Sequence, residues 1–165
     1  MEMTIREMKE KDWEAVAQIY LEGIDTKLAT FQAEVPSYES WDRSHVETCR
    51  LVAEVDDKVI GWTALSPYSS RSVYSGVAEV SVYIKASQRR KQVGEKLLQA
   101  LIFEAEKEGF WTLQSGIMEI NSASIALHSK VGFRFVGYRE RIAKDSNGVW
   151  QNSVLMERRS PFVGI

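Results

Sequence analysis

Hydrophobic positions recur along this chain with two different periods, and the changes of period predict where strands and helices lie. Residues 4–8 alternate between apolar and polar side chains, which is typical of a half-buried strand. A helical spacing follows, and we expect Asp12 to cap this helix. Its inward positions are Trp13, Val16, Ala17, Tyr20 and Ile24. Residues 26–37 show no period and are expected to be irregular, after which Ser37 is expected to cap a second helix over residues 38–48.

A hairpin is predicted by two β-rich runs, residues 51–55 and 59–65, which are separated by Asp56-Asp57-Lys58. A serine-rich loop over residues 68–76 leads into a further strand, residues 77–84. Strict alternation divides that strand between two faces. One face is apolar and carries Ala78, Val80, Val82 and Ile84, whereas the other carries Glu79, Ser81 and Tyr83.

The strongest helical pattern begins at Val93 and is closed by Gly109. Its apolar stripe consists of Val93, Leu97, Leu98, Leu101, Ile102 and Ala105. Residues 111–118 again have the composition of a strand.

A short helix capped by Asn121 or Ser122 is expected next. Its predicted inward residues are Ala123, Ala126, Leu127 and Val131. Two final strands are predicted at residues 133–140 and 150–157. Between them lies Asn147-Gly148, a dipeptide that favours a type I′ turn.

The predicted order is therefore roughly β-α-α-β-β-β-α-β-α-β-β. Strand, helix and strand in succession favour a parallel pair in the middle, and hairpins at both ends make the sheet mixed. A chain of 165 residues can form one sizeable core. We expect a single α/β domain with a mixed, α+β-type sheet over residues 1–165.

Composition and charge exclude several classes of function. Hydrophobic residues make up 44 % and charged residues 27 %, as in ordinary globular proteins. The net charge of −2 lacks the positive field that non-specific nucleic-acid binding requires, and no apolar run is long enough to span a bilayer. Cys49 is the only cysteine, which excludes an intrachain disulfide and leaves too few thiols for a cysteine-based metal site. We therefore expect no metal, no nucleic-acid partner, no membrane partner and a cytoplasmic location.

A basic loop directly before the long helix is the first candidate for chemistry. Arg89, Arg90 and Lys91 precede Gly94, which falls in the first turn of the helix. Free N–H groups and the positive end of the helix dipole bind phosphate well, and a glycine allows close approach of backbone. The alternative is a solvated basic loop in which Gly94 eases packing.

This loop resembles motif A of the Gcn5-related N-acetyltransferase superfamily, whose pyrophosphate loop reads Arg/Gln-x-x-Gly-x-Gly/Ala. Arg89, Val93 and Gly94 match, but Gln92 stands where the first glycine is usual, so a side chain must be accommodated there. Residues 121–133 resemble the superfamily's motif B, Asn-x-x-Ala/Ser…Gly-Phe. The resemblance implies an acyl-CoA N-acyltransferase fold.

Further stretches resemble the phosphinothricin / methionine sulfoximine acetyltransferase subfamily, so that the resemblance covers about residues 4–158. They are Ala29-Thr30-Phe31, Val35-Pro36, residues 61–66, residues 77–83 and residues 137–141. The resemblance implies transfer of acetyl from acetyl-CoA to the amino group of a small amino-acid-like acceptor. A homodimer is also expected, because dimers are common among such relatives.

The resemblance also implies roles for particular residues in holding acetyl-CoA. Backbone groups of Val82, Tyr83 and Ile84 would face the pantetheine and the thioester. The pyrophosphate would be held by the loop formed by Arg89, Arg90, Lys91, Gln92, Val93 and Gly94. Asn121 and Lys130 would contact the cofactor from the second motif.

On the acceptor side, Glu79 is expected to act as general base, with Ser81 beside it. Arg71 resembles a loop arginine that meets an acidic group of the substrate, and the subfamily match suggests that Phe31 and Trp62 line the acceptor pocket. His128 occupies the place of a tyrosine that protonates the leaving thiolate in many members. It is therefore either a proton donor or a helix residue with one satisfied hydrogen bond.

Other functions stay open at this point. The acceptor could instead be a polyamine, an antibiotic or a protein N-terminus. Gln92 also motivates a different class, a non-catalytic acyl-CoA-binding module. Cys49 could in principle be a nucleophile, but no pattern places a histidine beside it, so we expect a small buried hydrophobic residue.

Overall fold

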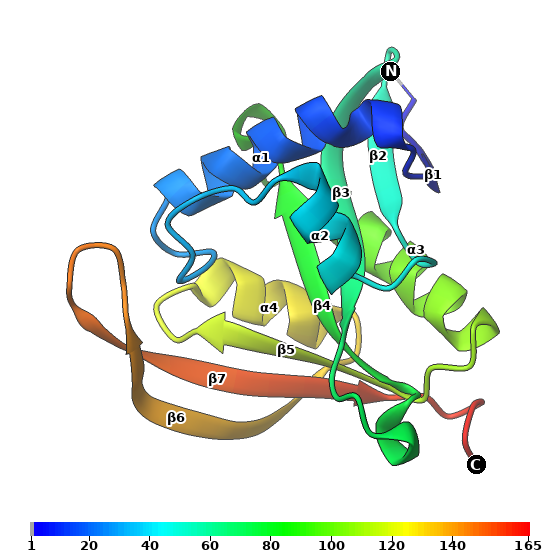
Figure 1. Ribbon diagram of the computed structural model, residues 1–165, viewed down its shortest axis with the longest axis vertical. Helices are drawn as coiled ribbons and strands as arrows, with labels where there is room; N and C mark the ends of the chain where they lie inside the picture. The colour runs from blue at the N-terminus through cyan, green and yellow to red at the C-terminus, as the bar shows by residue number, and fades with distance from the viewer. Residues whose placement is uncertain (1) are drawn as a thin grey trace.

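A computed structural model describes residues 2–165, so Met1, the first residue of the expected domain, lies outside this range. Within these residues, one sheet of seven strands has the order β1-β2-β3-β4-β5-β7-β6 (Figure 1). The strands are β1 (Thr4–Glu7), β2 (Leu51–Val55), β3 (Lys58–Pro67), β4 (Val77–Ile84), β5 (Thr112–Met118), β6 (Arg134–Lys144) and β7 (Trp150–Arg159). The helices are α1 (Trp13–Asp25), α2 (Tyr38–Ser44), α3 (Val93–Lys107) and α4 (Ser122–Lys130). The expected mixed α/β fold and the order of its elements are thus confirmed.

The sheet is antiparallel except at its centre, where β4 and β5 run parallel, as predicted from the strand–helix–strand order. This parallel ladder is short, because only Val77–Glu79 pair with Thr112–Gln114. Beyond those residues β4 continues to Ile84 and β5 to Met118 without pairing to each other. The centre of the sheet therefore divides into two diverging strands.

Two hydrophobic clusters cover the two faces of the sheet. On one face, all six residues of the predicted α3 stripe are buried against the apolar face of β4. On the other face, α1 and α2 pack over β3 and β4 through Val16, Tyr20, Trp41 and Trp62. On the same side, β5, β7 and β6 present mostly exposed or half-buried residues. One half of this face is therefore left accessible.

Helix α2 is shorter than predicted, ending at Ser44 instead of residue 48. The guanidinium of Arg50 donates hydrogen bonds to the carbonyl oxygens of Asp42, His45 and Val46. In addition, the amide of Val46 bonds to Leu65 of β3 at 2.8 Å. These tertiary contacts satisfy the backbone groups that another helical turn would have used.

The expected cap of α1 is wrong. Within the described chain, the Asp12 side chain makes no hydrogen bond to α1. Instead it accepts from the backbone amide of Lys9 at 2.8 Å and forms a bidentate pair with Arg6 at 2.8 and 2.9 Å. Arg6 also binds Glu54 of β2, so that Asp12 ties the start of α1 to the sheet.

Two further expectations need correction. In α4, Ala123 and Ala126 are exposed, whereas His128 is buried, because the helix is turned relative to the predicted stripe. In the β6–β7 hairpin Gly148 has a φ of +77°, but Asn147 has no positive φ, so the turn is not type I′. The five-residue connection is closed by the amide of Gly148 bonding to Asp145.

Among the described helices, none combines the length and the apolar character needed to cross a membrane.

The Arg6–Asp12 pair predicts a pH-dependent contribution to stability. Hydrogen bonding to Arg6 lowers the pKa of Asp12 from 3.8. A lowered pKa in the folded state stabilises the protein above the unfolded-state pKa, and this contribution is lost as the pH falls through the folded-state value. We expect Asp12→Asn to lower the free energy of unfolding by about 2 kcal/mol at pH 7, and the gap to close below about pH 4, as measured by urea denaturation.

Asp42→Asn is the matched control, because Asp42 pairs with Arg50 but is 46 % exposed. Its effect should be smaller, since exposed ion pairs contribute little. A loss at Asp12→Asn that is the same at pH 7 and at pH 3 would contradict the assignment to this ion pair.

Candidate active site

The divergence of β4 and β5 opens a cleft with a volume of about 580 Å³. It extends along β4 to the start of α3 and is closed by α4 and by the segment that follows α1. Its lining residues are Gly23, Thr26, Leu28, Ala29, Val82, Tyr83, Ile84, Gln88, Arg89, Arg90, Gln92, Val93, Gly94, Glu95, Asn121, Ala123, Ser124, Leu127 and Lys130. Cavities of this size hold cofactors and small substrates.

The loop between β4 and α3 leaves unpaired backbone amides in the lining of the cleft. Arg90 and Gln92 have φ values of 65° and 66°, and α3 begins directly after Gln92. The first hydrogen bond of the helix is donated by the amide of Lys96 to the carbonyl oxygen of Gln92. Within residues 2–165, the amides of residues 93–95 therefore bond to no protein acceptor. Together with the helix dipole and two arginines, such free amides bind phosphate groups well.

Gly94 is explained by packing between helices. A Cβ on this residue would lie 2.9 Å from Cδ2 of Leu127 in α4. The absence of a side chain thus lets α3 and α4 approach at the closed end of the cleft. Both explanations that the sequence allowed are compatible with this geometry, because Gly94 packs against Leu127 and also lines the cleft, where its amide bonds to no described protein acceptor.

Ten of the eleven residues expected to hold the cofactor line this cleft. The exception is Lys91, which is exposed and lies outside the lining. Lys130 pairs with Glu95 at 3.0 Å. Asn121 caps α4 by accepting from the amide of Ser124, and its Nδ2 donates to the carbonyl of Leu28. Asn121 therefore joins α4 to the segment that follows α1.

Sequence reasoning missed most of the wall that this segment contributes. Thr26, Leu28 and Ala29 line the cleft together with Gly23 at the end of α1, yet residues 26–37 show no periodicity. A Cβ at Gly23 would lie 2.6 Å from the Tyr83 ring, which packs directly on α1. Burial raises the pKa of Tyr83 well above its usual 10, so that the phenol is a neutral wall of the cleft. The match at Ala29-Thr30-Phe31 was the one signal in the sequence for this wall.

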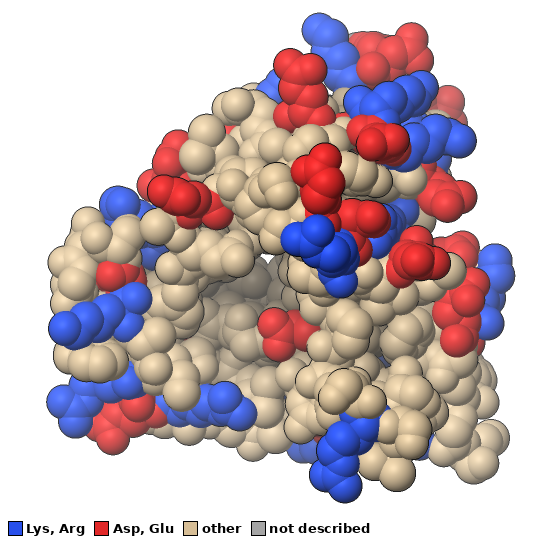
Figure 2. All heavy atoms as spheres, viewed as in Figure 1, with Lys and Arg blue, Asp and Glu red and all other residues tan. Residues whose placement is uncertain are grey.

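Glu79 lies where the parallel ladder ends, on the opposite face of β4 from α3. It is exposed, and Nε2 of Gln114 donates to its Oε2 at 3.3 Å. Ser81 follows on the same face and is half-buried. Figure 2 shows a hollow at the centre of this view, where Figure 1 draws β4 and β5 apart, with an acidic side chain at its edge.

The other acceptor-side residues are more scattered. Arg71 is exposed in the loop before β4, with its guanidinium 5.5 Å from the centre of the Tyr74 ring. Phe31 is half-buried in the segment after α1. Trp62 is fully buried and stacks on Tyr83, so it belongs to the core between α1 and the sheet instead of a pocket wall.

His128 lies behind the cleft. It is 2 % exposed and is absent from the lining, and Nδ1 bonds to the carbonyl of Ser124 at 2.7 Å. Burial lowers the pKa of His128, which keeps the ring neutral. Its ring meets Phe133 edge-on. This geometry supports the second of the two interpretations, a helix residue with one satisfied hydrogen bond.

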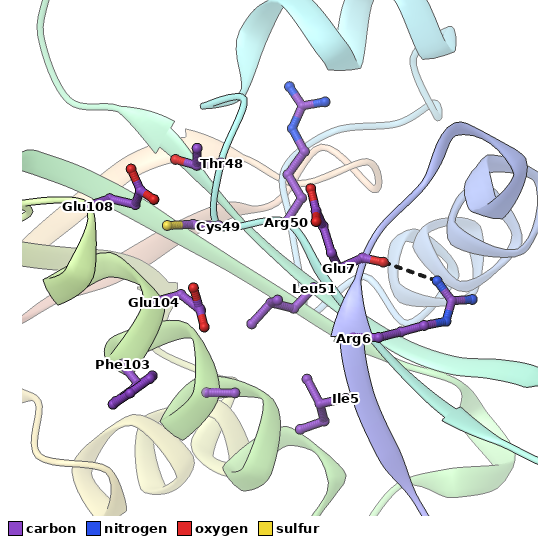
Figure 3. Close-up of a pocket in the computed structure, with 11 residues that line it drawn as sticks. Ile5, Arg6, Glu7, Thr48, Cys49, Arg50, Leu51, Phe103, Glu104 and Glu108 are labelled. Carbon is purple, nitrogen blue, oxygen red and sulfur yellow. Dashed lines mark hydrogen bonds between the residues drawn. The ribbon is translucent and has the colours of Figure 1, made fainter.

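A second concavity of about 450 Å³ lies between α3 and the β1–β2 part of the sheet (Figure 3). Cys49 borders it, with its sulfur directed toward α3 (Figure 3). The residue is 7 % exposed, and burial raises the pKa of Cys49 to about 11. At neutral pH it is a protonated, small core residue, as expected. Over residues 2–165, no three His, Cys, Asp or Glu side chains are grouped so that they could hold a metal ion.

Comparison with known proteins places this geometry in a family. The model of the acetyltransferase (GNAT) family matches residues 10–133. The phosphinothricin N-acetyltransferase of Alcaligenes faecalis is 32 % identical over 94 % of this chain and 81 % of its own length. An L-methionine sulfoximine/L-methionine sulfone acetyltransferase of Pseudomonas aeruginosa is 25 % identical over 95 % of this chain and 94 % of its own.

Among solved structures, a phosphinothricin acetyltransferase from Sinorhizobium meliloti in complex with acetyl-CoA superposes with a TM-score of 0.89. It is 26 % identical, and the match covers 99 % of this chain and 91 % of that one. The match to the family model spans the diverging strands, the basic loop and both helices that enclose the cleft. This chain belongs to the GNAT family of acetyltransferases.

Proposed function

We propose that the protein transfers acetyl from acetyl-CoA to the amino group of a small amino-acid-like acceptor. One observation carries this proposal: the free amides at the start of α3 lie along the same cleft as the part of β4 that is not paired with β5. Glu79 is on this strand, three residues before Val82, where the lining of the cleft begins. The acceptor class is supported by relatives named for phosphinothricin and for methionine sulfoximine.

The cleft suits the separate parts of acetyl-CoA. The free amides of residues 93–95 can donate hydrogen bonds to a diphosphate, and the positive charges of Arg89 and Arg90 complement its negative charge. Past Glu79 the edge of β4 has no pairing with β5, so its peptide groups are available to the amides of the pantetheine arm. The thioester would then lie at the point where the two strands separate.

The reaction needs few protein groups. The acceptor ammonium loses a proton to Glu79, directly or through a water molecule, and the free amine attacks the acetyl carbonyl carbon. Charge that develops on the carbonyl oxygen is stabilised by backbone N–H groups on the free edge of β4. The new C–N bond forms, the C–S bond breaks, and the CoA thiolate takes up a proton.

Glu79→Gln tests this assignment. With methionine sulfoximine, phosphinothricin, spermidine and a peptide as acceptors, steady-state release of CoA should occur with the first two. Glu79→Gln should lower that rate by about 10²- to 10⁴-fold near neutral pH, because the amide cannot accept the proton. Acetyl-CoA affinity, measured by calorimetry, should stay unchanged and serves as the internal control.

Three results would contradict the proposal in different ways. An undiminished rate in Glu79→Gln would remove this residue as the base. Turnover with the peptide alone would overturn the acceptor class. Binding of acetyl-CoA without turnover of any amine would favour the non-catalytic module that Gln92 motivates.

Gln92→Gly tests whether the side chain at this position crowds the pyrophosphate. A left-handed conformation costs a non-glycine residue about 1–2 kcal/mol. Replacing Gln92 by glycine removes this cost, but the greater freedom of glycine in the unfolded chain offsets part of the resulting gain in stability. We expect the free energy of unfolding to rise by up to about 1 kcal/mol, and acetyl-CoA to bind up to about tenfold more tightly in calorimetry.

Arg90→Gly is the matched control, since Arg90 has a φ of 65° but also carries a charge. It should gain similar stability while weakening acetyl-CoA binding. Unchanged or weaker binding in Gln92→Gly would show that the glutamine is well accommodated.

The proposal includes the homodimer. Strand β6 is the edge of the sheet, and within the described chain it has no buried residue. Its outer backbone is free to pair with the same strand of a second copy about a two-fold axis. Large exposed apolar side chains on β6 and β7 are Phe135, Val136, Tyr138, Ile142 and Trp150.

Tyr138→Glu should therefore convert a dimer into a monomer in light scattering, because it places a charge in the interface. Phe103→Glu is the control, since Phe103 is 63 % exposed on α3, away from this edge. A wild-type protein with the mass of one chain would exclude the dimer.

A further inference from the structure

Two strand glycines are required neither by a positive φ nor by close packing, and of these only Gly137 lies at a register shift, the one that follows Phe135 in β6. The chain has ten glycines, all inside residues 2–165. Four adopt a positive φ, namely Gly109, Gly132, Gly148 and Gly164. Four others would bring a Cβ within 3.0 Å of a neighbour, namely Gly23, Gly61, Gly76 and Gly94. For Gly116 and Gly137 neither reason applies, because φ is not positive and a Cβ would meet no described atom within 4 Å.

These two glycines lie in one row across the sheet. Gly116 of β5 pairs with Leu155 of β7, and Leu155 pairs with Gly137 of β6. Paired residues share a face, and alternation places Gly116 on the same face as Gln114. This is the face with Glu79, since Gln114 pairs with Glu79 across the parallel ladder. The row thus lies on the half of the sheet that α1 and α2 leave accessible.

Gly116 is the first residue of β5 on this face beyond the last pair with β4. It follows Gln114 by about 6.6 Å along the strand. A glycine inside a strand costs about 0.5–1 kcal/mol relative to alanine. Where the fold does not require one, it marks a place where a ligand or another backbone approaches closely.

We infer that the space above Gly116 receives the side chain of the acceptor, and that Gly116 determines which acceptors fit. The inference rests on the proposed function, because it needs the acceptor amine beside Glu79. Half-buried Gln114 and Leu155 flank the space, one polar and one apolar. This lining suits an α-amino acid with an unbranched side chain that combines methylene groups and a polar end.

Gly116→Val tests the inference with two acceptors that differ in length, methionine sulfone and 2-aminobutyrate. The valine should raise the KM for methionine sulfone by about tenfold or more, and that for 2-aminobutyrate by less than about twofold. The kcat values and the KM for acetyl-CoA should stay unchanged. For an acceptor that binds without being acetylated, the inhibition constant replaces KM.

Gly137→Val is the matched control, because it has the same open surroundings but lies two strands farther from Glu79. Both variants should melt at or above the wild-type temperature, since valine suits a strand better than glycine. An equal rise in KM for both acceptors in Gly116→Val would overturn the inference, as would the same selectivity change in Gly137→Val.

The two proposals fail in distinguishable ways. If the wild-type protein acetylates no amine, the proposed function fails, and the inference fails with it. If the wild-type protein is active and Gly116→Val keeps the wild-type ratio of KM values, the inference alone is wrong.

Discussion

The separation of β4 from β5 is the constraint on which the rest of the site depends. A strand in the middle of a sheet normally has both edges paired, because unpaired buried peptide groups are costly. Here the ladder stops after three residue pairs, so one edge of β4 must be satisfied by water or by a ligand. Since α3 begins at the far end of β4, the same strand leads from free peptide groups to the free amides of a helix. A linear ligand with amide groups and a terminal diphosphate matches that succession.

Strong local periodicity explains which elements could be predicted from the sequence. The bounds of β4 and the six buried positions of α3 follow directly from alternation and helical spacing. The divergence could not be predicted in this way, because it depends on where the ladder between β4 and β5 ends, and this pairing of residues far apart in the sequence leaves no local pattern. Helix α2 was overestimated for the same reason, since Arg50 and Leu65, which bond to the backbone groups that a further turn would have used, lie beyond the helix in the sequence.

The candidate site shows the same division between local and long-range information. The motif around Arg89 and Gly94 identified the amide cluster because one loop and one helix turn form it. His128 was considered as a proton donor because of its place in the second motif, and Trp62 as a pocket residue because of the subfamily match. Burial of both residues is set by the elements that pack over them. Helix α4 offered little guidance, because its apolar residues do not form a clear stripe, and the buried position is a histidine. Motifs that are continuous in the sequence thus predicted the lining of the cleft better than the placement of the residues expected to contact the acceptor.

At two positions, Gln92 and Gly116, the residue differs from the type that the local backbone conformation and packing favour, and the two differences are opposite in kind. Gln92 has a side chain where the backbone conformation suits glycine, whereas Gly116 lacks one where the fold has room for it. Both choices lower stability relative to the preferred residue, by up to about 1 kcal/mol at Gln92 and about 0.5–1 kcal/mol at Gly116. No hydrogen bond of the Gln92 side chain and no close neighbour of Gly116 within the described chain offsets these losses of stability. Sequences that specify a single fold satisfy such local preferences except where function requires otherwise. The acceptor side chain that we propose would explain the glycine at position 116, whereas nothing in the structure explains the glutamine at position 92.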